Sequence, residues 1–136
     1  LLWDEARARL FACDCAERVL HLFEQEFPDD RRPRQALACV RAFAAGECDE
    51  TVLEQFSSLQ TEPVENASAR SAYVAAISAV RISRNEPWLI ASHAQDAVAA
   101  SVAKNQANAA RDAERAWQAE RLMQYYLGFL QQPPSC

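Results

Sequence analysis

Apolar residues are spaced by three and four along the first part of the chain. They lie at Ala6, Leu10, Cys13, Ala16, Leu20, Phe23 and Phe27. This spacing predicts an amphipathic helix from about residue 3 to 26, with its apolar stripe facing a core. Pro28 and Pro33 bracket the charged loop that follows, and Pro33 suits an early position of the next helix.

Two shorter helices are predicted after this loop. The first runs to about Ala45, where Gly46 supplies the left-handed backbone that often ends a helix. Its apolar stripe is Leu37, Val40 and Ala44. The second begins near Thr51, because Thr51 and Glu54 have the spacing of a capping box. Its buried side is predicted to be Val52, Phe56 and Leu59.

A fourth helix is predicted with Pro63 in its first turn. Its apolar face holds Tyr73, Ile77 and Val80, and another face holds Arg70, Arg81 and Arg84. These arginines suit an anion site, but a solvated or acid-paired helix face is the favoured interpretation. Asn85, Glu86 and Pro87 mark the next boundary.

The stretch from Trp88 to Leu130 contains no proline. One helix of that length would span ~60 Å, too long for so small a domain, so we predict a break between residues 104 and 108. The first piece is predicted to bury Ala91, Ala94, Val98 and Val102. The second is predicted to bury Ala109, Ala116, Ala119, Met123, Tyr126 and Leu130. Alanine stripes allow helix axes to approach closely, which favours tight antiparallel packing over residues 63–127.

Composition agrees with an all-helical chain. Only 2 of the 136 residues are glycine, and there is no Asn-Gly, Asp-Gly or Gly-Gly pair of the kind that tight β-hairpins need. The predicted fold is all-α, a compact single-domain bundle of about five to six helices with mostly antiparallel neighbours. It spans residues 1–130, and residues 131–136 are predicted to form a flexible C-terminal tail.

The cysteines and the absence of long apolar runs predict a cytoplasmic protein. No run approaches the ~18 residues of a membrane span, and the chain lacks the pattern of a signal peptide. The five cysteines are odd in number, which disfavours a disulfide framework. Cys13, Cys15 and His21 cannot converge on a metal from one helix. We therefore expect thiols, no metal and no cofactor.

Catalytic patterns are weak. His93 and Asp96 share a helix face, which suits a general base, but the sequence places no nucleophile beside them. An acid and a histidine three residues apart are also commonplace on a helix surface. Phosphate loops, His-Glu-x-x-His and nucleophile elbows are absent from the sequence. We expect a protein that is not an enzyme.

Charge is divided unevenly along the chain, whose net charge is −5. Residues 1–68 hold 14 acids and 7 bases, whereas residues 69–136 hold 5 acids and 7 bases. This balance argues against nucleic-acid binding and favours a basic protein partner. The densest acidic stretch supplies the candidate partner-binding residues Glu47, Asp49, Glu50 and Glu54. Stabilisation of a helix start by the helix dipole is the alternative interpretation.

Four strings of residues carry a family resemblance. They are Asp14-Cys15-Ala16-Glu17-Arg18-Val19-Leu20, Asp30-x-Arg32-Pro33-Arg34-x-Ala36, Arg41-Ala42-Phe43-Ala44-x-Gly46-Glu47 and Glu114-Arg115-Ala116-Trp117-Gln118. Together they resemble a family of small bacterial immunity proteins, which are antidotes to toxins used between competing bacteria. The resemblance implies a helical fold, no catalysis and a protein partner. Within these strings, Asp14, Glu17 and Arg34 are interpreted as pairing between the first two helices.

Two functional hypotheses follow. The first is an immunity protein that binds and blocks a cognate toxin by a non-catalytic, stoichiometric interaction, with its acidic surface occupying a basic cleft. The second is a helical scaffold or adaptor domain excised from a longer protein, for which the absence of an initial methionine leaves room.

Overall fold

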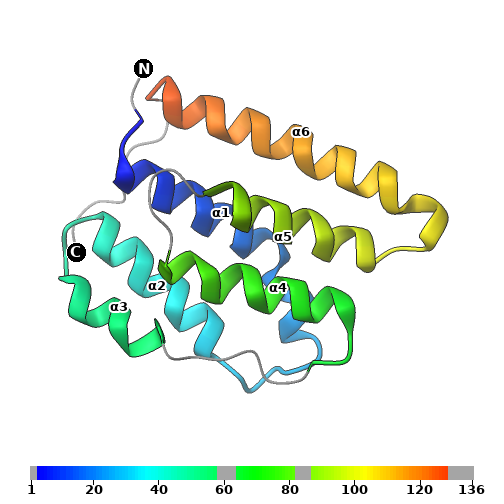
Figure 1. Ribbon diagram of the computed structural model, residues 1–136, viewed down its shortest axis with the longest axis horizontal. Helices are drawn as coiled ribbons and strands as arrows, with labels where there is room; N and C mark the ends of the chain where they lie inside the picture. The colour runs from blue at the N-terminus through cyan, green and yellow to red at the C-terminus, as the bar shows by residue number, and fades with distance from the viewer. Residues whose placement is uncertain (1–2, 58–63, 82–86, 129–136) are drawn as a thin grey trace.

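The structure, a computed structural model, describes residues 3–57, 64–81 and 87–128 (Figure 1). These ranges contain six α-helices, two short 3-10 segments and no strand, so the predicted all-α fold is confirmed. The elements are α1 (Glu5–Glu24), α2 (Arg32–Ala44), α3 (Glu50–Ser57), α4 (Ala67–Ser78), η1 (Ala79–Arg81), α5 (Pro87–Ala100), η2 (Lys104–Gln106) and α6 (Ala107–Tyr126). Within them, no helix is both long and apolar enough to cross a membrane.

Helix α1 is the central element, since α2, α4, α5 and α6 all contact it (Figure 1). Asp4 caps its first turn by accepting a hydrogen bond from the Arg7 amide at 2.8 Å. Every residue from 8 to 16 is buried, so α1 is enclosed on all sides there rather than along one stripe. The buried stripe of α1 is shorter than predicted, because Phe27 lies beyond the end of the helix and is 40% exposed.

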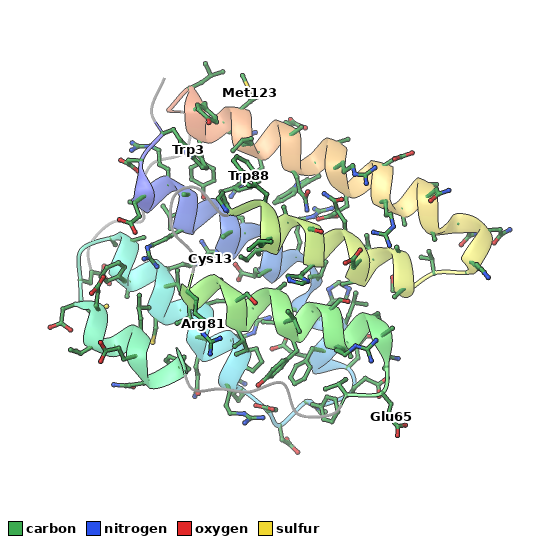
Figure 2. All side chains as sticks on the ribbon, viewed as in Figure 1. Trp3, Cys13, Glu65, Arg81, Trp88 and Met123 are labelled. Atoms are coloured by element: carbon green, nitrogen blue, oxygen red, sulfur yellow. The ribbon has the colours of Figure 1, made fainter. Side chains whose placement is uncertain are left out.

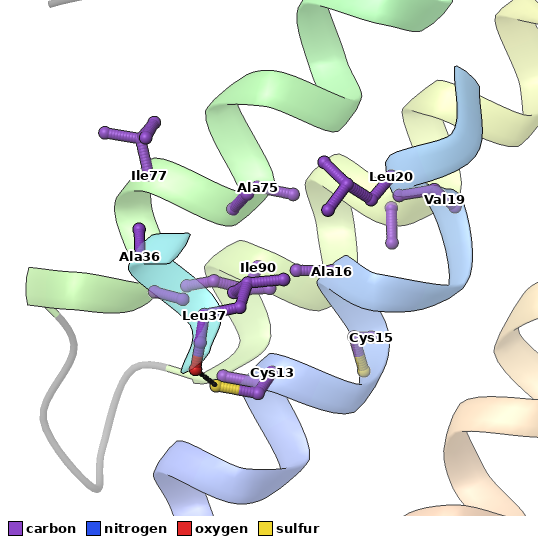
Figure 3. Packing of buried hydrophobic residues seen from close by; sticks show 14 of the residues in the cluster. Cys13, Cys15, Ala16, Val19, Leu20, Ala36, Leu37, Ala75, Ile77 and Ile90 are labelled. Atoms are coloured by element: carbon purple, nitrogen blue, oxygen red, sulfur yellow. Dashed lines mark hydrogen bonds between the residues drawn. The ribbon is translucent and has the colours of Figure 1, made fainter. Parts of the chain in front are cut away.

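The core is built from small side chains around α1. Ala16 of α1, Ala75 of α4 and Ile90 of α5 are fully or almost fully buried in one cluster (Figure 3). The Cys13 thiol also lies in this core, where its Sγ is 3.9 Å from the Leu37 carbonyl oxygen of α2. Alanines at these contacts let the helix backbones approach closely, as the alanine-rich composition predicted.

Helix α2 has the predicted shape, but α3 starts differently. Gly46 follows α2 with φ +77°, the left-handed conformation that the sequence predicted. The capping box at Thr51 is wrong: α3 begins at Glu50, and Asp49 Oδ1 accepts a hydrogen bond from the Thr51 amide at 3.0 Å. An aspartate just before the helix accepts from the free N–H groups as well as a threonine does.

The buried side of α3 also differs from the prediction. Leu53 is buried, whereas Val52 and Phe56 are half-buried. Leu59 lies outside the described residues. The helix therefore presents Leu53 most directly to the core, one position along from the predicted Val52.

Helix α4 begins at Ala67, later than predicted. Asn66 caps it by accepting a hydrogen bond from the Ala69 amide at 3.0 Å, and Pro63 lies outside the described residues. The predicted apolar face is confirmed, since Tyr73, Ile77 and Val80 are all buried. Of the three arginines, Arg70 and Arg81 are exposed, and Arg84 is not among the described residues.

The predicted break near residue 104 is confirmed. Helix α5 ends at Ala100, η2 spans Lys104–Gln106 and α6 returns antiparallel beside α5 (Figure 1). Ala91 and Ala94 are buried as predicted, and Val98 is half-buried. Val102 is 38% exposed instead of buried, because it lies in the turn after α5 has ended.

The predicted inner face of α6 is wrong. Ala109, Ala116, Ala119 and Met123 are exposed, Tyr126 is half-buried, and Leu130 lies outside the described residues, as does the predicted tail 131–136. The buried residues of α6 are instead Glu114, Gln118 and Tyr125. They are spaced by four and seven, so they also form a stripe along one side of a helix. The side chains of this stripe contact polar groups on α1 and α5.

Candidate partner-binding surface

The acidic stretch predicted from the sequence lies at the turn between α2 and α3. Glu47, Asp49, Glu50 and Glu54 are all exposed, and we call these four residues the acidic cluster. Glu47 and Asp49 precede α3, and Glu50 and Glu54 lie one turn apart on it. The arrangement leaves four carboxylates at the surface, where they can attract a basic partner.

Asp49 has a local role as well. Its Oδ1 accepts hydrogen bonds from the hydroxyl and the amide of Thr51. These bonds, the hydroxyl's first, hold the pKa of Asp49 below its ordinary value, so it stays ionised at neutral pH. Stabilisation of the start of α3 therefore explains why Asp49 is acidic. It does not depend on an acid at Glu47 or Glu54.

Positive side chains adjoin one side of the acidic cluster. Glu50 and Glu54 line a pocket of about 170 Å³ with Arg9 of α1 and Arg81 of η1, the latter labelled in Figure 2. Arg9 donates from Nη2 to Glu5 Oε1 at 3.2 Å, and its guanidinium carbon is 4.8 Å from the centre of the Phe43 ring. Glu47 and Asp49 do not line this pocket. The negative potential is therefore expected to be strongest on their side.

A buried polar network, which the sequence indicated only in part, lies beneath α6. Asp14 of α1 is 8% exposed and accepts hydrogen bonds from Arg41 Nη2 at 2.9 Å, Arg121 Nε at 2.8 Å and Tyr125 Oη at 2.6 Å. Burial, followed by the charge of Asp14, raises the pKa of Tyr125, so its hydroxyl stays protonated and donates. This network joins α1, α2 and α6 at one carboxylate.

The predicted pairing of Asp14, Glu17 and Arg34 between α1 and α2 is confirmed in part. Arg34 contacts Glu17 at 3.6 Å and binds Glu24 at 2.7 Å. Asp14 and Glu17 instead share Arg41, whose Nη2 lies 2.9 Å and 2.5 Å from them. The sequence identified the helices that pair but not the contribution of α6, whose residues are about 100 positions away.

Two further contacts hold α6 in place. Arg18 donates from Nε and Nη2 to the buried Glu114 at 3.0 and 3.1 Å, and its guanidinium carbon lies 4.1 Å from the centre of the Trp117 ring. Gln118 donates to the Ala91 carbonyl at 3.0 Å and accepts from Gln95 at 2.7 Å. The spacing of Glu114, Gln118, Arg121 and Tyr125 is the signal that could have revealed this inner face.

The residues considered for catalysis lie on α5, and those considered for a metal site lie on α1. The Asp96 carboxylate accepts a hydrogen bond from Arg111 of α6 at 2.5 Å, so it serves the contact between α5 and α6 rather than His93. Cys13 and Cys15 are buried in α1, whereas His21 is exposed. Across the parts of the chain that the structure describes, no three His, Cys, Asp or Glu residues are grouped to hold a metal ion.

The two core cysteines are expected to be unreactive in the folded protein. Burial raises the pKa of Cys13 to about 12 and also raises that of Cys15. Because the thiolate is the nucleophile, a maleimide at pH 7.5 should label the half-buried Cys39 and Cys48 at least about tenfold faster than Cys13 and Cys15. Peptide mapping by mass spectrometry measures each rate. Equal labelling in urea is the control, and equal labelling without urea would contradict the expectation.

The comparison with protein families agrees with the resemblance. A family model described as Imm-5 like putative immunity protein matches residues 4–125. The chain belongs to this family. The matched range runs from the cap of α1 to the end of the α6 contacts, so it includes both the acidic cluster and the Asp14 network. Searches of curated proteins and of solved structures found no match.

Proposed function

We infer that this protein is an immunity protein that neutralises a toxin by binding it, without catalysis. Membership of an immunity-protein family over residues 4–125 carries this inference. The proposed mechanism is stoichiometric blockade, in which the bound protein covers the toxin's functional surface. The acidic cluster is the proposed contact, because exposed carboxylates complement a basic cleft such as that of a toxin acting on nucleic acid.

The test of this function starts from a search for a toxin gene beside the gene for this protein. Calorimetric titration of the purified pair should give one complex of fixed stoichiometry, and toxin activity should fall linearly to zero as that ratio is reached. A protein that silences many equivalents of toxin would be acting catalytically, which would refute the blockade. Failure to bind the neighbouring toxin at all would refute the immunity function for that pair.

The acidic cluster is tested by charge reversal. Changing Glu47, Asp49, Glu50 and Glu54 to lysine should slow association with a basic toxin by about tenfold or more at low salt, because the electrostatic attraction that speeds encounter is reversed. Stopped-flow fluorescence over a salt series measures the association rate. The difference between the proteins should shrink as salt screens the charges.

A matched control separates the location of the charge from its total. Asp29, Glu65, Asp112 and Glu120 are exposed and belong neither to α3 nor to the turn before it. Reversing these four acids gives the same change in net charge. The control substitutions should slow association with the toxin much less than reversal of the acidic cluster does. Circular dichroism must show that both variants are folded, since lysines at the start of α3 oppose its dipole. Equal slowing by the two variants would mean that net charge, rather than the acidic cluster, steers binding.

A further inference from the structure

A groove of about 250 Å³ is lined by residues of α5 and α6, with one residue of α1. Its walls are mostly apolar, with Trp88 and Ala91 from α5, Ala119 and Leu122 from α6, and Phe11 of α1 beneath. Trp88, labelled in Figure 2, lies at the second position of α5 and is 50% exposed. A large aromatic side chain is thus held half in solvent by a helix, beside an apolar hollow.

The two amide side chains that line the groove already have partners. The amides of Gln95 and Gln118 bind each other, and Gln118 also binds the Ala91 carbonyl. The floor therefore suits apolar atoms, because no amide there is left to be satisfied. At about 250 Å³ the groove is also smaller than the roughly 300–1,000 Å³ of typical cofactor sites, and fits one large side chain.

Arg115 supplies charge at the groove. Among the described residues that line the groove it is the one charged side chain, and it is 58% exposed. Its Nε donates to Gln95 at 3.0 Å, and its Nη1 is 3.5 Å from the largely exposed Asp112. A guanidinium has five N–H donors and these contacts use two of them, so a carboxylate can accept hydrogen bonds from the others at this exposed side chain.

We propose that this groove docks a bulky apolar side chain of a partner protein that carries a carboxylate beside it. The apolar chain would lie against Trp88 and Leu122, and the carboxylate would bind Arg115. Tryptophan and arginine next to an apolar hollow are the residues that most often dominate protein interfaces. Leu89 and Met123, which follow Trp88 and Leu122 in the chain, are each more than half exposed. This site goes beyond the proposed function, since it needs no basic toxin and lies apart from the acidic cluster.

The first experiment uses 1-anilinonaphthalene-8-sulfonate, a fluorescent probe that joins two aromatic groups to an anion. Trp88→Ala should weaken its binding by about tenfold, and Arg115→Gln by about fivefold, because each removes one half of the recognition. N-phenyl-1-naphthylamine, which lacks the sulfonate, should respond to Trp88→Ala but not to Arg115→Gln. Leu127→Ala is the control, since Leu127 is 51% exposed but does not line the groove.

A peptide then tests the protein chemistry directly. A short synthetic peptide with phenylalanine next to glutamate should displace the naphthalene probe at millimolar concentration, and its alanine and glutamine counterparts should not. The proposal would be overturned if the probe bound both groove variants as tightly as the unchanged protein, or if Leu127→Ala weakened its binding. All variants are compared by thermal melting, so that a loss of fold is recognised.

Two other occupants are outcomes of the same experiment. A chain ending at Gly128 that binds the probe, when the full chain does not, would show that residues 129–136 fill the groove. A dimer by analytical ultracentrifugation that dissociates on Trp88→Ala would show that a second copy fills it. Either result would overturn the proposal. None of these measurements involves a toxin, so their failure is distinct from failure of the immunity function.

Discussion

Replacing Asp14 by alanine is expected to lower the free energy of unfolding by about 3 kcal/mol. The carboxylate binds Arg41, Arg121 and Tyr125 from two other helices. Its loss removes this acceptor from all three, and Arg41 then keeps only Glu17 of its two carboxylate partners. Removing one partner of a buried ion pair typically costs 3–5 kcal/mol. Here the two arginine side chains are 28% and 32% exposed and can partly turn to water, which places the effect at the lower end. Urea denaturation measures it.

Glu17→Ala is the matched control for Asp14. Glu17 binds the same Arg41, but its own side chain is 46% exposed. An ion pair of that exposure is worth about 1 kcal/mol or less. A similar loss from both variants would mean that the strength of the network lies in Arg41 rather than in the burial of Asp14.

Phe23→Ala should have an effect of similar or larger size. The ring is 2% exposed and lies with its centre 5.0 Å from those of Phe27 and Tyr73, so truncation leaves a cavity between α1 and α4. Such truncations cost roughly 3–5 kcal/mol. The measurement is again the urea midpoint, at an unchanged slope.

Phe27→Ala provides the comparison within the same aromatic group. Phe27 stacks on Phe23 but is 40% exposed, so its removal should cost about 1 kcal/mol and leave no closed cavity. The sequence pattern placed both rings in one buried stripe. If both truncations cost the same, Phe27 is as much part of the core as the pattern suggested, and its exposure is energetically unimportant.

The elements that could be predicted from the sequence were those set by strong local signals. Gly46 ended α2 because few other residues adopt its backbone conformation readily, and the length of the segment after Trp88 required a break near residue 104. The start of α3 was missed because Asp49 and Thr51 are both good caps, and their spacing alone does not choose between them.

The orientation of α6 could not be predicted, because the helix has two stripes. One is formed of alanines with Met123, and the other contains Glu114, Gln118 and Tyr125. Burying alanines gains little area, whereas the polar stripe meets Arg18, Gln95 and Asp14 in complementary positions. Periodicity within α6 shows both stripes, and the choice between them depends on residues far away in the chain.

The same limit applies to the two candidate surfaces. The acidic cluster was visible in the sequence because four acids lie within eight residues. The groove was not, because Trp88 and Arg115 are 27 positions apart and come together only when α5 and α6 pack antiparallel. Neither the position of Trp88 at the start of a helix nor its residue type indicates that it is half exposed.

The Asp14 network also bears on the order in which the chain can fold during its synthesis. Asp14 is synthesised early. Two of the side chains that donate hydrogen bonds to it, Arg121 and Tyr125, follow 107 and 111 positions later. At roughly 5–20 residues per second, the ribosome takes on the order of ten seconds to supply them. Throughout that interval the Asp14 carboxylate on α1 has only Arg41 available among its three hydrogen-bond donors. The nascent chain can therefore complete the packing around its central helix only after its last helix has been made.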